Sequence, residues 1–198
     1  MAATALSFKG HAAYLAGQPG AVVTLSEAAR RDPTVYIGQR AYDALQAARG
    51  RAMLGETSEV LGLLSLAADE DAETAAYAGP VPDWHYYRTP EFFLLERGLV
   101  YAHLGRATDA RTWDVRAVES LSNGLGSMPA DMRESEWTAD YLLALAAAQL
   151  HDGDRDSAVE TLRTVRRIAT SVGSRRLVRR TRDSQRIRRG SGSISPRT

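Results

Sequence analysis

The chain has 198 residues, of which 44% are hydrophobic, and a formal net charge of +1. This is long enough to bury a sizeable core, with the composition of ordinary globular proteins. The absence of cysteine excludes disulfides, thiolate nucleophiles, sulfur-ligated zinc and thiol redox control. The longest apolar run, Tyr141 to Ala148, is far shorter than the roughly 20 residues that cross a bilayer, and the first ten residues do not form a signal peptide. We expect a cytoplasmic protein without membrane contact.

The charge is distributed unevenly along the chain. Residues 163–198 contain 12 Arg and one acidic residue, Asp183, while the preceding part holds 13 basic and 23 acidic residues. A basic arm attracts phosphate groups and an acidic body repels them, so this polarity bears on the choice of partner.

The first pattern, residues 7–32, predicts two helices joined by a turn at residues 18–20. Gly17 is placed to end the first helix and Pro19 to begin the second. This hairpin begins almost at Met1. Because a helical-repeat stack normally starts with a segment that shields its first apolar face, we expect that an N-terminal part is missing or was never translated, and the sequence does not establish that Met1 is the true start.

A second hairpin is predicted over residues 34–54 and 58–69, with its turn at Gly55. Its second helix should be the best buried of the chain, because leucines at 61, 63, 64 and 66 surround it. Three prolines and Gly79 then predict a long loop from about Tyr77 to Pro90.

The third hairpin, residues 91–121, carries the clearest pattern of small and aromatic residues. We expect Gly105 to end its first helix, Gly98 and Ala110 to lie where the two helices cross, and Tyr101 to fill the gap beside the crossing. With Glu91 as position 1, the small and aromatic positions 8, 11, 15, 20 and 27 are held by Gly98, Tyr101, Gly105, Ala110 and Ala117.

Pro129 is predicted to open a helix that carries Arg133 and Trp137, ahead of a last hairpin over 141–150 and 156–170 that turns at Gly153. A final helix from Arg175 to about Arg189 should cap the stack, and residues 190–198 have the composition of a disordered tail.

These positions resemble the tetratricopeptide pattern, although the spacing between successive turn glycines exceeds the 34-residue length of the standard repeat. We therefore predict an all-α fold, a tetratricopeptide-like solenoid of helical hairpins with about four units and a C-terminal capping helix, forming one domain over residues 1–189.

Motifs of catalysis and of cofactor binding are absent from the sequence. Asp152, Asp154 and Asp156 have the alternate spacing of a calcium loop, but Ser157 and Arg163 stand where such a loop needs Gly and Glu. Asp154 and Asp156 fit better at a helix N-terminus, where carboxylates accept backbone hydrogen bonds. The prediction is a protein that is not an enzyme, with no catalytic residues, metal or cofactor.

Positions 2, 5, 9, 12 and 13 of each first helix usually face the concave groove of such repeats. His103 and His151 share position 13 and should stack along the groove, either as hydrogen-bond partners or pH-sensitive contacts for a ligand, or as caps of their helices. The groove candidates are His11, Tyr14, Tyr42, Arg49, Phe92, His103, Asp140 and His151.

The predicted loop adds Trp84 and Tyr87 beside His85. These aromatics either grip a peptide or flat ligand, or fill a wedge between two repeats. The basic C-terminal helix likewise has two interpretations, a polar outer face of a capping helix or a nucleic-acid arm. The arginines concerned are Arg175, Arg176, Arg179, Arg180, Arg182, Arg186, Arg188 and Arg189.

Several segments together resemble the tetratricopeptide C-terminal half of actinobacterial XRE-type helix-turn-helix transcriptional regulators: FKGHAAYLAGQPGAVV, PDWHYY, LGRATDA and the arginine-rich end. The resemblance implies a sensor that binds a protein or peptide and often forms a homodimer, preceded by a DNA-binding domain that this chain lacks. The alternatives are a stand-alone nucleic-acid-associated protein that acts through its basic C-terminal helix, or a truncated remnant of a regulator.

Overall fold

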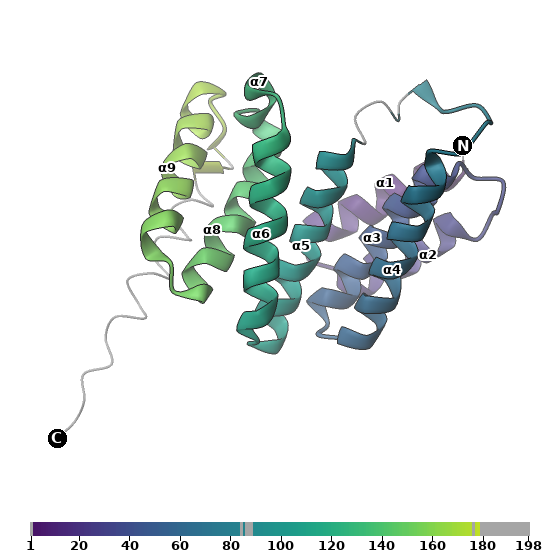
Figure 1. The fold of residues 1–198 in the computed structure, drawn as a ribbon, viewed down its shortest axis with the longest axis horizontal. Helices are drawn as coiled ribbons and strands as arrows, with labels where there is room; N and C mark the ends of the chain where they lie inside the picture. The colour runs from purple at the N-terminus through teal and green to yellow at the C-terminus, as the bar shows by residue number, and fades with distance from the viewer. Residues whose placement is uncertain (1, 84, 86–88, 176, 179–198) are drawn as a thin grey trace. The chain divides into compact units, whose positions relative to one another are not determined.

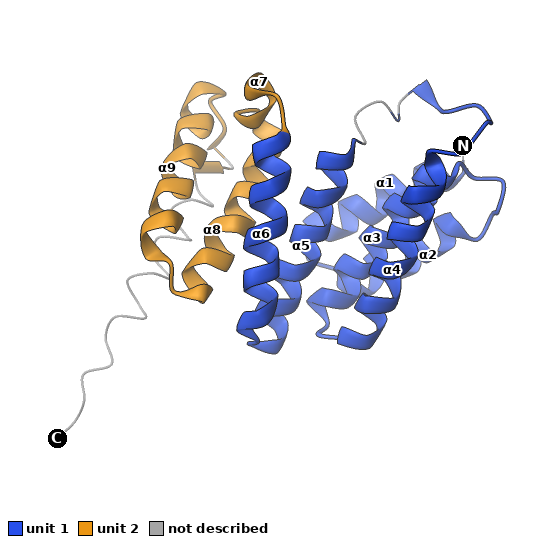
Figure 2. Ribbon diagram, in the orientation of Figure 1, with its two compact units in different colours: residues 1–127 blue, residues 128–198 orange. Residues whose placement is uncertain are grey.

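The computed structural model describes residues 2–83, 85, 89–175 and 177–178. Within these residues the chain forms only helices and the segments that join them, so the predicted all-α class is confirmed. The chain divides into two compact units, Met1–Ser127 and Met128–Thr198 (Figure 2), and each is described by itself.

In its described residues, unit 1 has six α-helices arranged as three successive hairpins (Figure 1). The first helix of each hairpin packs against the second along its length. The helices are α1 (Ala2–Leu15), α2 (Pro19–Arg30), α3 (Ile37–Met53), α4 (Thr57–Thr74), α5 (Pro90–Thr108) and α6 (Arg111–Ser127).

The turns of the first two hairpins are at glycines, as predicted. Gly17 and Gly55 have φ angles of 68° and 78°, a left-handed conformation that glycine adopts without steric cost. The predicted turn at Gly105 is wrong. α5 continues to Thr108, and the left-handed residue is Asp109 with φ 53°, because a short polar side chain also tolerates this conformation.

Gly105 has a different role, since it lies inside α5 where the helix meets α6. A Cβ atom at Gly105 would be 2.7 Å from Oδ1 of the buried Asp114, and one at Gly98 would be 2.5 Å from Cγ of Leu121. Ala110 lies in the turn and not at the crossing. The two glycines of α5 lie two helical turns apart, and their lack of a side chain permits α6 to approach α5 closely over that length.

α3 is the best-buried helix of unit 1, and the expectation that α4 would be is wrong. Leu61 and Leu66 of α4 are 43% and 38% exposed, because only one side of that helix is covered. α3 packs against α2, α4 and α5, whereas α5, apart from its hairpin partner α6, packs against α3 and only slightly against α4. The inner sides of α3 and α5 consequently face each other.

The described residues between α4 and α5, which are 75–83, 85 and 89, form no α-helix, in agreement with the predicted loop. Thr89 ends it as the N-cap of α5, with its Oγ1 accepting a hydrogen bond of 3.5 Å from the Phe92 backbone N–H. His85 anchors the loop on the start of α3. Its ring is 8% exposed, lies 4.7 Å from the ring of Tyr36, and occupies the space that a side chain at Gly38 would need.

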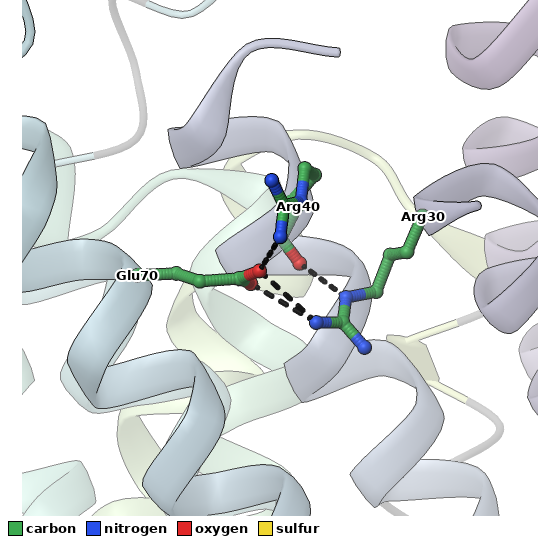
Figure 3. Close-up of polar contacts among 3 residues, drawn as sticks. All are labelled: Arg30, Arg40 and Glu70. Carbon is green, nitrogen blue, oxygen red and sulfur yellow. Dashed lines mark hydrogen bonds and ion pairs between the residues drawn. The ribbon is translucent and has the colours of Figure 1, made fainter. Parts of the chain in front are cut away.

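A buried carboxylate ties α2, α3 and α4 together (Figure 3). Glu70 of α4 accepts hydrogen bonds from Nη2 of Arg40 at 2.6 Å and from Nη2 of Arg30 at 3.1 and 3.2 Å. Nε of Arg30 also donates to the backbone carbonyl of Arg40 at 3.0 Å. Charge-assisted bonds of this kind are short and directional, so they fix the three helix ends relative to one another.

Unit 2 contains α7 (Ala130–Arg133), the 3₁₀ helix η2 (Glu136–Thr138), α8 (Ala139–Asp152) and α9 (Arg155–Ser171). α8 and α9 form a hairpin that turns at Gly153, as predicted. Asp154 caps α9, with Oδ1 accepting from the Ser157 backbone N–H at 3.1 Å, which confirms the capping interpretation of this residue. Trp137 lies in η2, beyond the short helix that Pro129 opens.

Residues 175 and 177–178 are helical, and Leu177 is fully buried. This is the start of the predicted capping helix, whose remaining part and the tail at 190–198 lie outside the described residues. A search of the described helices finds none with the length and hydropathy required to span a membrane.

The close crossing at Gly98 predicts a stability difference between two glycine substitutions. Gly98→Ala should lower the free energy of unfolding by about 1–3 kcal/mol, because its new methyl group would overlap Leu121. Gly62→Ala, on a part of α4 with no atoms near the new Cβ, should raise that free energy by about 0.5–1 kcal/mol. Urea denaturation of both variants measures the two effects, and equal stabilities would refute this crossing.

Candidate ligand-binding site

Five side chains from the first helices of the three hairpins meet in unit 1, and we call them the inner-face cluster. They are Tyr14 of α1, Gln46 and Arg49 of α3, and Glu96 and His103 of α5. Gln46, Arg49 and Glu96 are buried, whereas Tyr14 and His103 are partly exposed. The cluster thus has a buried interior and an accessible edge.

An ion pair forms its interior. Nη1 of Arg49 lies 3.2 Å from Oε2 of Glu96, and the two side chains are only 1% and 3% exposed. Nη2 of Arg49 also donates to Oε1 of Gln46 at 3.4 Å. Removing both charges from water is costly, so each depends on the other, and the pair holds α3 and α5 in register.

Tyr14 covers the pair from α1. Its ring centroid is 4.1 Å from Cζ of Arg49, a distance at which the guanidinium is attracted to the aromatic face. The Tyr14 hydroxyl and Nε2 of His103 share a hydrogen bond of 3.1 Å. Tyr14 therefore links all three first helices through one side chain.

His103 is neutral across the physiological range. Burial, together with the nearby positive charges of Arg106 and Arg49, lowers its pKa to about 3. The interpretation of His103 as a pH-sensitive contact near neutrality is therefore not supported. Neither does it stand directly before a turn, since α5 continues to Thr108.

A row of buried polar side chains extends from the cluster along α3. Nε2 of Gln39 donates to Oδ2 of Asp43 at 2.6 Å, and Nε2 of Gln46 donates to Oδ1 of Asp43 at 3.3 Å. Gln46 also donates to the backbone carbonyl of Ser7 in α1 at 3.1 Å. The sequence analysis did not identify this row. Gln39, Asp43 and Gln46 are spaced by four and three residues, a spacing that places them on one face of an otherwise alanine-rich helix.

The structure places three of the predicted groove residues in the core. Tyr42 and Phe92 are both 8% exposed and their ring centroids are 5.8 Å apart, and Arg49 is 1% exposed. The physical reason is that α5 packs on α3, so that the inner sides of these two helices cover each other. In this conformation these three residues do not reach a ligand.

The remaining groove candidates of unit 1, His11, Tyr14 and His103, form the accessible edge together with Arg106, which the sequence analysis did not single out. We call these four residues the rim. His11 and Arg106 are exposed, and Tyr14 and His103 are partly exposed. The His11 and Tyr14 ring centroids are 6.2 Å apart. The rim thus offers one guanidinium, two imidazoles and a phenol at one end of the first helices.

Asp140 and His151 belong to α8 of unit 2, where Asp140 is partly exposed and His151 exposed. Because the two units are described separately, the expected stacking of His103 and His151 stays a prediction. Trp84 and Tyr87 lie outside the described residues. Their neighbour His85 is buried against Tyr36. The two interpretations of Trp84 and Tyr87 stay predictions.

Arg175 is the one described member of the predicted basic set, and Arg176, Arg179, Arg180, Arg182, Arg186, Arg188 and Arg189 lie outside the described residues. The C-terminal half of α9 exposes three further arginines: Arg163 pairs with Glu160 at 2.9 Å, Arg167 pairs with Glu134 at 2.5 Å, and Arg166 lies beside them in sequence. Across the described residues, no group of three or more metal-ligating side chains is arranged to hold an ion.

Comparisons with models of protein families, with curated proteins and with solved structures find no match to this chain.

The mutual dependence of Arg49 and Glu96 is testable by substitution. Glu96→Ala should lower the free energy of unfolding by about 3–5 kcal/mol, because it leaves the Arg49 charge buried without its carboxylate. The double variant Arg49→Met/Glu96→Leu should recover most of this loss, since neither charge is then buried. Urea denaturation provides the measurement.

The matched control is Glu160→Ala, which breaks the exposed ion pair with Arg163. It should lower the free energy of unfolding by less than about 1 kcal/mol. If Glu96→Ala were as mild as this control, the buried ion pair would not exist in solution.

Proposed function

We propose that this chain is a tetratricopeptide-like helical-repeat module that binds a protein or peptide ligand in the cytoplasm, as the sensor or interaction part of a bacterial transcriptional regulator. The observation that carries the proposal is the convergence of side chains from three successive first helices on the inner-face cluster, whose accessible edge is the polar rim. Such repeats are typical scaffolds for extended binding surfaces.

The chemistry of the rim supports a ligand that presents oxygen acceptors. Arg106 supplies a positive charge, and His103, neutral at physiological pH, supplies a hydrogen-bonding group without a charge of its own. An acidic side chain or a peptide carbonyl would match this set. The buried Arg49–Glu96 pair would act beneath the rim by holding α3 and α5 rigid, which reduces the entropy that binding must overcome.

The connection with transcription rests on the resemblance of the turn and loop motifs to XRE-type regulators. Sequence-specific DNA recognition is not part of the proposal for this chain, because no helix-turn-helix motif occurs in its sequence.

A nucleic-acid role is the second candidate, and the exposed arginines of α9 favour it. Arg163, Arg166 and Arg167 precede the basic C-terminal segment and point to solvent. Two of the three already pair with acidic side chains, which reduces their net charge toward phosphate. We therefore place peptide binding first.

Selection from a displayed random peptide library tests the proposal. The wild-type chain should enrich peptides with a shared acidic or polar pattern. Arg106→Ala and His11→Ala should each weaken the binding of the selected peptides by about tenfold, because each substitution removes an exposed contact group. Neither substitution should change the helical circular dichroism spectrum.

Glu119→Ala, an exposed position on α6, is the matched control and should leave the affinity unchanged. Failure to enrich a common pattern would refute peptide binding, and enrichment that is insensitive to both rim variants would refute the rim as its site.

A further inference from the structure

The side of α4 that faces away from α3 combines two exposed leucines with small residues. Leu61 and Leu66 are 43% and 38% exposed. They are five residues apart in sequence, which places them about 140° apart around the helix. Short side chains and one glycine occupy the surface between them. We call the following residues the outer face: Ser58, Leu61, Gly62, Ser65, Leu66 and Asp69.

Gly62 lies in the middle of the outer face, and the packing of unit 1 does not require a glycine there. Among the described residues, no atom of another element lies within 4 Å of the Cβ that a larger residue would place at this position. Glycine inside a helix is also less favourable than alanine. Gly62 does leave room for a second helix to approach the backbone of α4 closely, between the two leucines.

The charge of α4 is entirely negative. The helix contains five acidic residues and no basic residue. Glu70 is held by two arginines, whereas Glu59, Asp69 and Glu73 are exposed. The ion pairs formed among the described residues do not include these three carboxylates. The outer face therefore presents negative charge that the described part of the chain does not neutralise.

Two further carboxylates are at the unfavourable end of the helix. Asp71 and Glu73 lie in the last turn of α4, and that turn contains no basic residue. The last backbone carbonyls of a helix carry a partial negative charge, which stabilises cations and disfavours anions. A positively charged partner would relieve this repulsion.

The sign of the charge selects the kind of molecule that fits this surface. Nucleic acids and anionic membranes would be repelled by the carboxylates. A second copy that used the same surface symmetrically would place carboxylates against carboxylates. An amphipathic helix with basic residues would pair with the carboxylates and cover the two leucines.

We propose that the outer face of α4 is the docking surface for a basic amphipathic helix of another protein. The partner packs apolar side chains beside Leu61 and Leu66, and its backbone comes closest to α4 at Gly62. Its lysines or arginines pair with Asp69 and the neighbouring carboxylates. This surface is separate from the rim, whose chemistry suits a ligand with oxygen acceptors, so the inference does not rest on peptide binding at the rim.

Fluorescence anisotropy with a labelled synthetic helix tests this proposal. The probe is an amphipathic peptide of Leu, Ala and Lys with the 18-residue length of α4. Its counterpart has the same pattern with Glu in place of Lys. The wild-type chain should bind the Lys peptide with an affinity that falls as the salt concentration rises, and it should not bind the Glu peptide.

Gly62→Leu tests the close approach. The new side chain should weaken binding of the Lys peptide at least about tenfold, because it fills the space between the two leucines. The free energy of unfolding should not fall, since leucine favours the helix and meets no neighbouring atom at its Cβ. Loss of binding is therefore not a result of unfolding. Ser122→Leu adds the same side chain at an exposed position of α6 and should leave the affinity unchanged.

Asp69→Lys tests the charge. It should weaken binding of the Lys peptide by about tenfold, because it replaces an attractive group with a repulsive one. Glu119→Lys makes the same change of net charge at an exposed position of α6 and is the matched control. It should have little effect on the affinity. Arg106→Ala, at the rim, should have none.

A wild-type chain that does not bind the Lys peptide would overturn the proposal, whether the outer face is then bare or covered by the basic end of the chain itself. Equal binding of the Glu peptide would overturn the basic character of the partner. Equal weakening by Glu119→Lys would show diffuse attraction to an acidic protein and would also overturn the proposal, as would a Gly62→Leu variant that binds like the wild type. A loss caused by Arg106→Ala would move the binding to the rim.

Discussion

The structure of unit 1 depends on the buried ion pair between Arg49 and Glu96. Two charges that are 1% and 3% exposed are tolerable only when they remain in contact. α3 and α5 must therefore stay together at this point, and their inner sides close over the pair. The same closure removes Tyr42 and Phe92 from solvent.

The ion pair also explains how α1 is positioned. Tyr14 places its ring over the Arg49 guanidinium and its hydroxyl on His103, and Gln46 holds the Ser7 carbonyl. One side of α1 is thereby committed to the interior. The other side keeps Phe8 and Leu15 in solvent. The polar rim and the exposed apolar side of α1 are thus two consequences of the same orientation of this helix.

The sequence predicted the all-α class and the first, second and last hairpins because their signals are local. Glycine at 17, 55 and 153 adopts a left-handed turn in each case. The third turn was misplaced because Gly105 satisfies two different requirements equally well, a helix end and a close crossing. Only the contact with Asp114 shows which applies.

The candidate site was less predictable, because it depends on which helices pack together. A regular repeat pattern implies that inner-side residues remain exposed, but α5 packs on α3 and only slightly on α4. Nothing local to Arg49 indicates that Glu96 will lie opposite. Likewise, the leucines of α4 suggested burial, although Leu61 and Leu66 remain exposed because no helix of unit 1 covers that side.

The most direct test of this account is an NMR titration of His103, assigned by comparison with a His103→Gln variant. The structure predicts that its imidazole signal stays in the neutral position as the pH falls through 6.5 toward 4, with cross-peaks to the Tyr14 ring, because burial and two nearby arginines hold the pKa at about 3. Titration of His103 near pH 6.5 while the chain remains folded would contradict it. The three first helices would then not converge on the Arg49–Glu96 pair as described.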